Sequence, residues 1–369
     1  MRIAIFTAEF PPYPGGVATY TYELAAAGAR AGHEVAVYDF GPDPTPGAGF
    51  EVVSCRPHAY ENYKFPWAAM VAQTALARRR FDLLLAADLK DVVACSLVNT
   101  RAEMRAAVHG TDVQSKLLVK YFSRVGFRPL RRYRRIFANS AFTRELLLRA
   151  HPYLEPTVCR VAPLGVDRYW FQPPEAQDVA ALRRRFGQLD GRFVAVCVGR
   201  LERRKGQNHA IRAVRALPAA LRGRTSLLIV GRVVDKDYAA ELAREAAEAE
   251  ADVRLVGDIP QNELRALYGV SDLLVHAATP YQGRVEGFGL VVLEAAAAGT
   301  PTLATRVDAL PEVVVEDETG LLVEDGDFAA LSQALTRAAT QGLRRELGKR
   351  CRQTALQYTW DRCAATTFG

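Results

Sequence analysis

Short runs rich in Val, Ile and Leu alternate along this chain with longer segments of helical periodicity, and this alternation most restricts its fold. In the first half, the apolar runs lie at residues 3–6, 35–38, 83–85, 106–109 and 136–138. A second series lies at residues 192–198, 227–230, 253–256, 273–276 and 302–304. Parallel strands need helical crossovers, so this order is typical of them. The sequence therefore predicts an α/β protein with two doubly wound sheets.

A polar stretch that contains Pro163, Pro173 and Pro174 separates the two series. At roughly 100–200 residues per domain, 369 residues are too many for one ordinary domain. We expect residues 1–170 to form the first domain and residues 171–355 the second. Ligands bind open parallel sheets at the carboxyl ends of the strands. We therefore expect a cleft where these ends of the two sheets meet.

Composition excludes several classes of protein. Hydrophobic residues make up 49% of the chain and charged residues 24%, a globular balance that argues against disorder. No uncharged apolar run approaches the ~20 residues of a membrane helix. The chain opens on a strand pattern rather than a signal peptide, and its six cysteines form no C-x-x-C pair. We expect a cytoplasmic protein without a zinc site or disulfides.

The excess of positive over negative charge is confined to the first half. Residues 1–170 carry 22 Lys and Arg against 15 Asp and Glu, whereas residues 171–369 carry 26 of each. Eight of these cations lie between Ser115 and Arg135, a stretch with no acidic residue. Such a stretch favours nucleic acid, anionic lipid or another acidic partner, and a solvated helix face is the plain alternative. We expect no nucleic acid, because no recognised binding motif or aromatic platform is present.

Two loops that follow strands carry glycine. Gly15 and Gly16 come between the first strand and a helix, where the backbone approaches a ligand closely and the helix favours an anion. The alternative is an ordinary turn, and no G-x-G-x-x-G follows any strand. Arg200 and Lys205 follow the first strand of the second series, and together they suit a diphosphate without a metal. We expect the neighbouring Arg203 and Arg204 to be solvated.

Glu286 and Glu294 lie at the two ends of the most specific motif in the sequence. Leu290 onward predicts a buried helix that ends at Gly299, so its first turn offers free N–H groups to a phosphate. Glu294 lies about 6 Å further along the axis at ~1.5 Å per residue, which suits a ribose. The alternatives are the paired acids of a glycosidase and a solvent-facing glutamate.

His109 ends a strand, so its ring faces the expected cleft and could donate a hydrogen bond to a substrate oxygen. A histidine satisfied inside the fold is the alternative. We treat the remaining histidines as structural: His33, His58, His151, His209 and His276. Asp235 and Asp237 match a metal-holding D-x-D pattern, but we expect helix capping there.

Together these features resemble the retaining glycosyltransferases of family four, the group 1 enzymes that include glycogen synthases and phosphatidylinositol mannosyltransferases. The resemblance spans nearly the whole chain, and Glu286-x7-Glu294 is its most specific part. The other motifs are Gly15-Gly16, His109-Gly110-Thr111-Asp112, Asn139-Ser140, Pro163-Leu164-Gly165-Val166-Asp167, Gly199-Arg200, Lys205-Gly206, Gly299-Thr300-Pro301, Pro311-Glu312 and Tyr358-Thr359-Trp360.

The resemblance implies the GT-B fold, with two facing Rossmann-like domains and a crossover helix over residues 356–369 that returns to the first domain. It implies an acceptor site in the first domain and a UDP- or GDP-sugar in the second, with no metal or other cofactor. The implied catalytic residues are Glu286, His109, Arg200 and Lys205. The implied donor-binding residues are Gly15, Gly16, Gly199, Gly231, Gly287, Phe288, Gly289, Leu290 and Glu294.

Three positions depart from the family pattern. Leu164 replaces the usual Asn, Asp308-Ala309 replaces a glycine pair, and Arg232-Val233-Val234 replaces a glycine-rich turn. The alternatives to a transferase are a nucleotide-sugar epimerase of the same fold and a non-catalytic nucleic-acid- or carbohydrate-binding protein. The acceptor would be a hydroxyl of a glycan, a lipid-linked sugar or a small molecule. Because the excess charge lies on the acceptor side, we expect an anionic acceptor or peripheral contact with the inner membrane face through Lys116 to Arg135.

Overall fold

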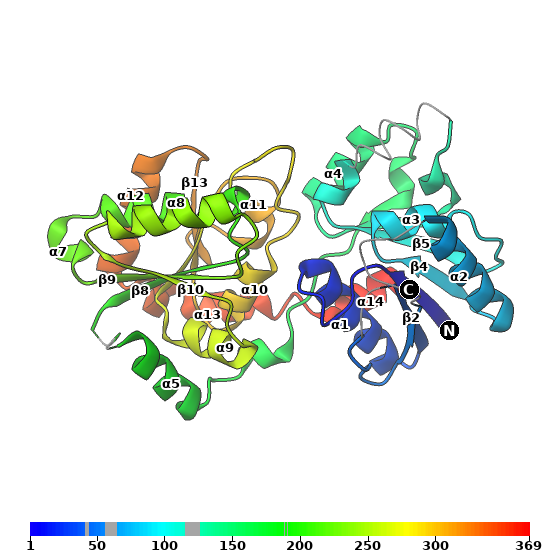
Figure 1. The fold of residues 1–369 in the computed structure, drawn as a ribbon, viewed down its shortest axis with the longest axis horizontal. Helices are drawn as coiled ribbons and strands as arrows, with labels where there is room; N and C mark the ends of the chain where they lie inside the picture. Colours follow the sequence, from blue (N-terminus) through cyan, green and yellow to red (C-terminus); the bar gives the residue numbers. More distant parts are fainter. Residues whose placement is uncertain (41–43, 56–64, 115–125, 188, 190) are drawn as a thin grey trace. The chain divides into compact units, whose positions relative to one another are not determined.

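The computed structural model covers the full chain and describes all residues except 41–43, 56–64, 115–125, 188 and 190. The described chain forms two compact units, each treated by itself below (Figure 1). Unit 1 comprises Met1–Gly165 and Thr359–Gly369, and unit 2 comprises Val166–Tyr358. The divisions therefore fall at residues 165 and 359, not at the expected 170 and 356. The Val166 N–H donates to the Tyr358 carbonyl at 3.0 Å, so the chain enters and leaves unit 2 at one point.

Unit 1 contains a parallel sheet in the order β3-β2-β1-β4-β5-β6-β7. The strands are β1 (Arg2–Thr7), β2 (Glu34–Asp39), β3 (Glu51–Ser54), β4 (Leu83–Ala86), β5 (Glu103–Val108), β6 (Arg135–Ala138) and β7 (Cys159–Val161). Central β4 is buried along its whole length, as an apolar run in a sheet covered on both faces requires.

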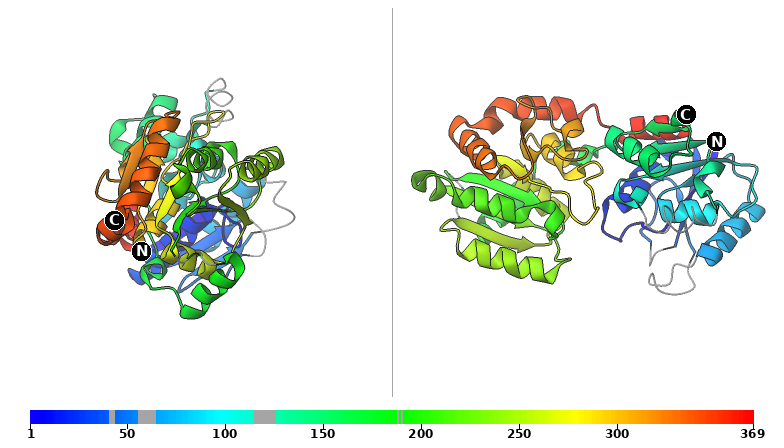
Figure 2. Two further views of the ribbon diagram at one scale, coloured as in Figure 1. Left: turned by 90° about the vertical axis from the view of Figure 1, so that its left-hand side faces the viewer. Right: turned by 90° about the horizontal axis from the view of Figure 1, so that it is seen from above.

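Helices cover both faces of this sheet (Figures 1 and 2). They are α1 (Gly16–Arg30), α2 (Phe65–Arg78), α3 (Leu89–Cys95), α4 (Ala141–Ala150) and α14 (Trp360–Phe368), with short 3₁₀ turns η2 (Thr111–Gln114), η4 (Pro129–Arg132) and η5 (Pro156–Val158). The last helix, α14, packs on α1, which confirms the expected crossover back to the first domain. A glycine permits this contact, because a Cβ on Gly28 would lie 2.8 Å from the Phe368 ring.

Unit 2 contains a second parallel sheet in the order β10-β9-β8-β11-β12-β13. The strands are β8 (Phe193–Val198), β9 (Thr225–Val230), β10 (Asp252–Gly257), β11 (Leu273–His276), β12 (Thr302–Thr305) and β13 (Gly320–Val323). The helices are α5 (Ala176–Phe186), α6 (Gln207–Arg215), α7 (Ala219–Arg222), α8 (Lys236–Ala247), α9 (Gln261–Val270), α10 (Leu290–Ala297), α11 (Leu310–Val313), α12 (Phe328–Gln341) and α13 (Leu343–Ala355), with 3₁₀ turns η6 (Arg168–Phe171) and η7 (Arg203–Lys205). Helix α6 packs with α8 and α12, and α10 packs with α13.

Each sheet reverses its direction of winding at one point. In unit 1 the reversal lies between β1 and β4, and in unit 2 it lies between β8 and β11. The crossovers on the two sides of such a point diverge, which leaves a crevice at the carboxyl ends of the two strands. The segments after β8 and β11 are therefore where unit 2 is expected to hold a ligand.

Three strands, β3, β7 and β13, are absent from the predicted set, and all three are edge strands. β3 has no fully buried residue, and β7 has only three residues, of which one is buried. An edge strand pairs on one side only and needs no long apolar run, so hydrophobic patterning is weakest there.

Candidate active site

Two glycines shape the loop between β8 and α6. Gly206 has φ +64, and a Cβ there would lie 1.7 Å from the Ala277 carbonyl oxygen just after β11. The loop therefore lies against the end of β11, an approach that only glycine allows. Gly231 at the end of β9 is similar, because its Cβ would lie 2.0 Å from the Gly199 carbonyl. The structure thus brings Gly199, Gly231 and Lys205 together at the reversal point of the sheet.

Lys205 and Arg204 both pair with Glu286. The Lys205 Nζ lies 2.5 Å from Glu286 Oε2, and an Arg204 Nη lies 2.9 Å from the same oxygen. The side chains of all three are about nine-tenths buried. The expectation of a solvated Arg204 is wrong, because the turn η7 directs this side chain inward. Arg203, one residue earlier, lies partly exposed over the Tyr238 ring and pairs with Glu241 at 2.8 Å.

Glu202 extends this set of ion pairs toward the surface. Its Oε1 accepts from Arg200 at 3.1 Å and from Arg204 at 2.9 Å, and its Oε2 accepts from Arg284 at 3.2 Å. Glu202 is buried, whereas the Arg200 and Arg284 side chains are about half exposed. We call the connected residues the Glu286 cluster: Arg200, Glu202, Arg204, Lys205, His276, Arg284 and Glu286.

His276, expected to be structural, belongs to this cluster. It ends β11, and its buried Nε2 donates to Glu286 Oε2 at 3.3 Å. Burial alone would raise the pKa of Glu286, but the Lys205 ammonium, the hydrogen bond from His276 and the Arg204 guanidinium lower it well below its usual value. Burial lowers the pKa of His276, so the ring is neutral and Glu286 is ionised at neutral pH.

A loop after β12 holds the backbone of Glu286. Asp308 accepts the Glu286 N–H at 2.7 Å, and the Ala309 N–H donates to the Glu286 carbonyl at 3.3 Å. Asp308 has φ +51, a left-handed conformation that glycine adopts most easily and that Asp tolerates. At this departure from the family pattern, Asp308 therefore adopts a left-handed conformation and holds the Glu286 backbone with its side chain.

The segment after Glu286 leads directly into α10, which begins at Leu290 as predicted. Gly289 caps the helix with φ +87 and no side-chain hydrogen bond, so the first turn keeps free N–H groups. Phe288 is buried, with its ring 6.1 Å from that of Tyr358. Glu294, one turn into α10, lies 3.5 Å from the Tyr268 hydroxyl, and burial raises its pKa to about 7.

In unit 1, the structure places His109 near the start of α1. The His109 ring lies 4.6 Å from that of Tyr20, which is one turn beyond Gly16. Its Nε2 donates to the Ala87 carbonyl at 2.8 Å, and its backbone N–H donates to Asp112. Since this bond uses Nε2, Nδ1 is the ring nitrogen that remains for a substrate. Gly15 is the N-cap of α1 and lies near the Glu9 carboxylate.

Other candidate sites have structural explanations. The Asp235 carboxylate accepts the Tyr238 N–H at 2.9 Å, so helix capping is confirmed for the D-x-D pattern. Within the described residues, no group of three or more His, Cys, Asp or Glu side chains could hold a metal ion.

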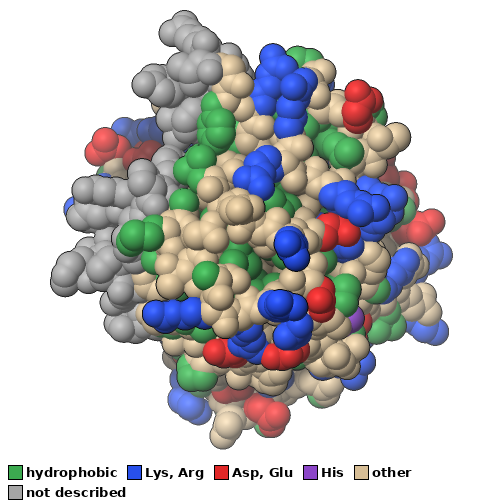
Figure 3. All heavy atoms as spheres, turned by 90° about the vertical axis from the view of Figure 1, so that its right-hand side faces the viewer, with side chains coloured by type: hydrophobic (Ala, Val, Ile, Leu, Met, Phe, Trp, Pro, Cys, Tyr) green, Lys and Arg blue, Asp and Glu red, His purple; other side chains and the backbone are tan. Residues whose placement is uncertain are grey.

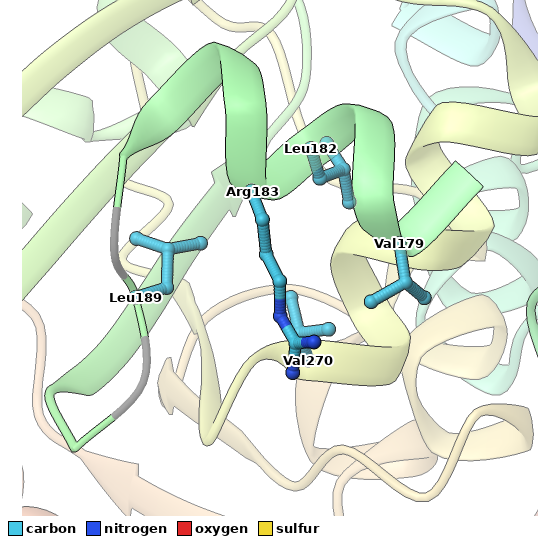
Figure 4. Close-up of a pocket in the computed structure, with 5 residues that line it drawn as sticks. All are labelled: Val179, Leu182, Arg183, Leu189 and Val270. Atoms are coloured by element: carbon cyan, nitrogen blue, oxygen red, sulfur yellow. The ribbon is translucent and has the colours of Figure 1, made fainter. Parts of the chain in front are cut away.

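A pocket of about 220 Å³ lies between α5 and α9, where Arg183 reaches toward Val270 (Figure 4). Apolar side chains form the rest of its lining, and it contains no predicted site residue.

Half of the basic stretch between Ser115 and Arg135 lies outside the described residues, namely 115–125. In the described part, Arg132 donates to the Ser96 and Val98 carbonyls, and Arg128 and Arg131 lie over the Tyr153 ring. This part forms the turn η4 and then β6 rather than a helix face. Cations lie among acidic and apolar side chains on the face of unit 1 seen in Figure 3. No helix among the described residues is long and apolar enough to cross a membrane.

The two parallel-sheet units and the crossover helix have the architecture of the GT-B fold. A family model described as Glycosyl transferases group 1 matches residues 164–357, more than half of the chain, and a model described as Glycosyltransferase Family 4 matches residues 14–169. The chain belongs to the group 1 glycosyltransferase family, so the resemblance is confirmed.

Curated relatives include two mannosyltransferases. One is a GDP-mannose-dependent α-(1-6)-phosphatidylinositol monomannoside mannosyltransferase of Mycolicibacterium smegmatis, 30% identical over 90% of this chain and 87% of its own. The other, from Corynebacterium glutamicum, acts on the monoacylated monomannoside and is 28% identical over 93% of this chain and 90% of its own.

Solved structures share the fold. A Rickettsia africae glycosyltransferase superposes with a TM-score of 0.80 at 17% identity, covering 100% of this chain and 96% of its own. Anabaena HepE, solved with UDP-glucose, superposes with a TM-score of 0.78 at 21% identity, covering 100% of this chain and 98% of its own.

Proposed function

We propose that this glycosyltransferase moves a sugar from a nucleoside diphosphate sugar to a hydroxyl acceptor with retention of anomeric configuration. The observation that carries this proposal is the Glu286 cluster, in which four cations share two carboxylates at the reversal point of the unit 2 sheet. Such a cluster favours a dianionic leaving group, since the cations are fixed in place before the ligand arrives.

In this proposal each predicted site residue has one role. Arg200 and Lys205 neutralise the leaving diphosphate, and the first turn of α10 offers it backbone N–H groups. Backbone groups of Gly15, Gly16, Gly199, Gly231 and residues 287–290 approach the donor closely. Glu294 accepts from the ribose, and Glu286 accepts from hydroxyls of the donor sugar. His109 contacts that sugar near the reacting carbon.

Retention in this proposal needs no covalent enzyme intermediate. The acceptor oxygen attacks the anomeric carbon on the face that the diphosphate leaves, and a departing phosphate oxygen takes the acceptor's proton. The protein then stabilises the charge of the leaving group and orients the two substrates. No metal takes part in this proposal.

For the donor, we propose GDP-mannose first and a UDP-sugar second, and for the acceptor a lipid-linked hydroxyl. The names of two relatives support this choice, because both describe enzymes that use GDP-mannose on a phosphatidylinositol monomannoside. These names favour transfer over epimerisation or simple binding.

We further propose a cytoplasmic enzyme that contacts the inner membrane face through Lys116 to Arg135. Co-sedimentation with liposomes that shows no preference for anionic lipid would overturn the membrane contact.

Thermal unfolding in the presence of UDP, GDP, ADP and dTDP tests the donor. A nucleotide at 100 times its Kd stabilises the folded state by about 2.7 kcal/mol, which gives a clear rise in Tm. We expect the rise with GDP or UDP, and no rise with any of the four would contradict the proposal. With the donor known, the anomeric configuration of the product by NMR tests retention.

A further inference from the structure

Arg204 is the most buried guanidinium of the Glu286 cluster, and none of the roles above uses it. One of its Nη atoms reaches Glu286 Oε2 at 2.9 Å and the Val285 carbonyl at 3.1 Å. The other Nη reaches Glu202 Oε1 at 2.9 Å. The side chain is 8% exposed, against 47% for Arg200. Arg204 is therefore fixed from both sides and is poorly placed to reach a ligand itself.

Glu286 has two cationic partners, and only one of them is available to a donor. Among the residues that the structure describes, Lys205 pairs with Glu286 alone, so its ammonium keeps donors for a phosphate. When a diphosphate binds there, the Lys205 charge is shared between the phosphate and Glu286. A buried carboxylate that loses half of its neutralising charge takes up a proton more readily. A protonated Glu286 would no longer accept hydrogen bonds with both oxygens.

We propose that Arg204 is the positioning residue of the donor site: its guanidinium keeps Glu286 charged and oriented while Lys205 engages the diphosphate. This inference rests on the proposed function. Among the described residues, the ionisable groups that act on Glu286 are Arg204 and Lys205 from η7, His276 from β11 and Asp308 from the loop after β12. His276 is neutral and Asp308 holds only the backbone N–H, so Arg204 is the remaining full positive charge.

Glu202 completes the arrangement, because it holds the second Nη of Arg204. It also makes the test practicable. Without Arg204, Glu202 keeps Arg200 and Arg284, and Glu286 keeps Lys205. Neither carboxylate is left unpaired in the free protein, so we expect Arg204→Gln to fold.

The test compares nucleoside diphosphates with their sugars by isothermal titration calorimetry at pH 8 and pH 5.5. The ligand pairs are GDP with GDP-mannose and UDP with UDP-glucose. The ratio of the two Kd values reports what the sugar adds to binding, which is the part that Glu286 supplies. The proteins are wild type, Arg204→Gln, Arg204→Lys and, as a control, Arg203→Gln, which removes a neighbouring cation outside the cluster. Circular dichroism and thermal unfolding check each fold.

In Arg204→Gln, we expect the sugar's contribution, relative to that in wild type at the same pH, to fall about tenfold from pH 8 to pH 5.5, since binding that needs an ionised group weakens tenfold for each pH unit below its pKa. The terminal phosphate of free GDP or UDP itself titrates at about pH 6 and changes this ratio in every protein, so each ratio is compared with that of wild type at the same pH. Arg203→Gln should stay within about twofold of wild type at both pH values. Arg204→Lys keeps the charge and should restore the wild-type ratio. A wild-type profile in Arg204→Gln, or a lysine variant that behaves like the glutamine variant, would overturn the proposal. If wild type bound neither GDP nor UDP, the proposed function itself would fail.

Discussion

The carboxyl ends of the two sheets hold four of their carboxylates in different ways. In unit 2, Glu202 and Glu286 are neutralised by side-chain cations. In unit 1, Asp88 accepts the N–H groups of Lys90 and Asp91, and Asp112 accepts that of His109. Asp88 and Asp112 of unit 1 therefore hold backbone N–H groups, whereas Glu202 and Glu286 of unit 2 hold side-chain cations. Net charge does not reveal this contrast, because residues 171–369 have no excess charge and yet contribute the four cations of the Glu286 cluster.

Two histidines show the same contrast. His109 follows β5 and His276 ends β11, so both occupy the carboxyl end of a parallel strand. His109 donates to a backbone carbonyl, whereas His276 donates to the carboxylate of the ion-pair cluster. The position of a histidine at the end of a strand therefore identifies it as a candidate site residue, and its hydrogen-bond partner decides its role.

The largest expected effect comes from Glu286→Gln. We expect kcat/KM for transfer to fall about 10²–10³-fold, the loss usual for one preorganised polar contact in an active site. The assay uses the donor found by thermal unfolding. Glu318→Gln, an exposed position in the same unit, is the control and should keep wild-type activity. Transfer at the wild-type rate in Glu286→Gln would remove the functional difference between the two sheet ends.

Lys205→Ala should weaken binding of GDP or UDP by about 10–100-fold, since hydrogen bonds to charged groups contribute about 1.5–3 kcal/mol. The loss should be smaller for the corresponding monophosphate, and calorimetry with both nucleotides measures the difference. Lys236→Ala, an exposed lysine at the start of α8, should bind like wild type. Equal losses for monophosphate and diphosphate would place Lys205 away from the terminal phosphate.

Glu294 should make nucleotide binding depend on pH. Its pKa is about 7, so its ability to accept from a ribose declines as pH falls through 7. We expect the several-fold advantage of wild type over Glu294→Gln at pH 8 to disappear by pH 5.5 in calorimetry with GDP or UDP. A pH-independent advantage would contradict a ribose contact through the ionised carboxylate.

The same group should affect stability with a definite sign. The folded-state pKa of about 7 exceeds the ordinary glutamate value of 4.5, so the folded protein holds the proton more tightly than the unfolded chain. The free energy of unfolding of wild type relative to Glu294→Gln is therefore greatest below pH 4.5 and declines as pH rises through 7. Urea unfolding at several pH values measures it, and the opposite slope would contradict the burial of Glu294.

The smallest effect is expected in unit 1. Asp88 caps α3, and Asp88→Ala should lower the free energy of unfolding by about 0.5–2 kcal/mol, the usual contribution of an N-cap. Nucleotide binding should not change, because this carboxylate holds the backbone N–H groups of a helix rather than a side-chain cation. Glu145→Ala on the exposed face of α4 should change stability by less than about 0.5 kcal/mol. A large loss of nucleotide affinity in Asp88→Ala would break the distinction drawn between the two sheet ends.

Much of the fold could be predicted because its signals are local. Central strands are continuous apolar runs, and the start of α10 follows from Gly289 and the residues after it. Edge strands β3 and β7 give no such signal, since each pairs on one side only. Glu286 and Lys205 could be selected from their motifs, but His276 was missed although it shares its strand position with His109.

What the sequence determined by itself is the set of elements whose energy is local or periodic: buried strands, capped helices and the glycines that turn between them. What only the tertiary structure decided is the partner of each charge. Arg203 and Arg204 are adjacent and chemically identical, yet one lies at the surface and the other between two buried carboxylates. Glu286 is 82 residues from Arg204 along the chain. Only folding brings the two within 3 Å, and a buried charge is stable only where such a partner is present.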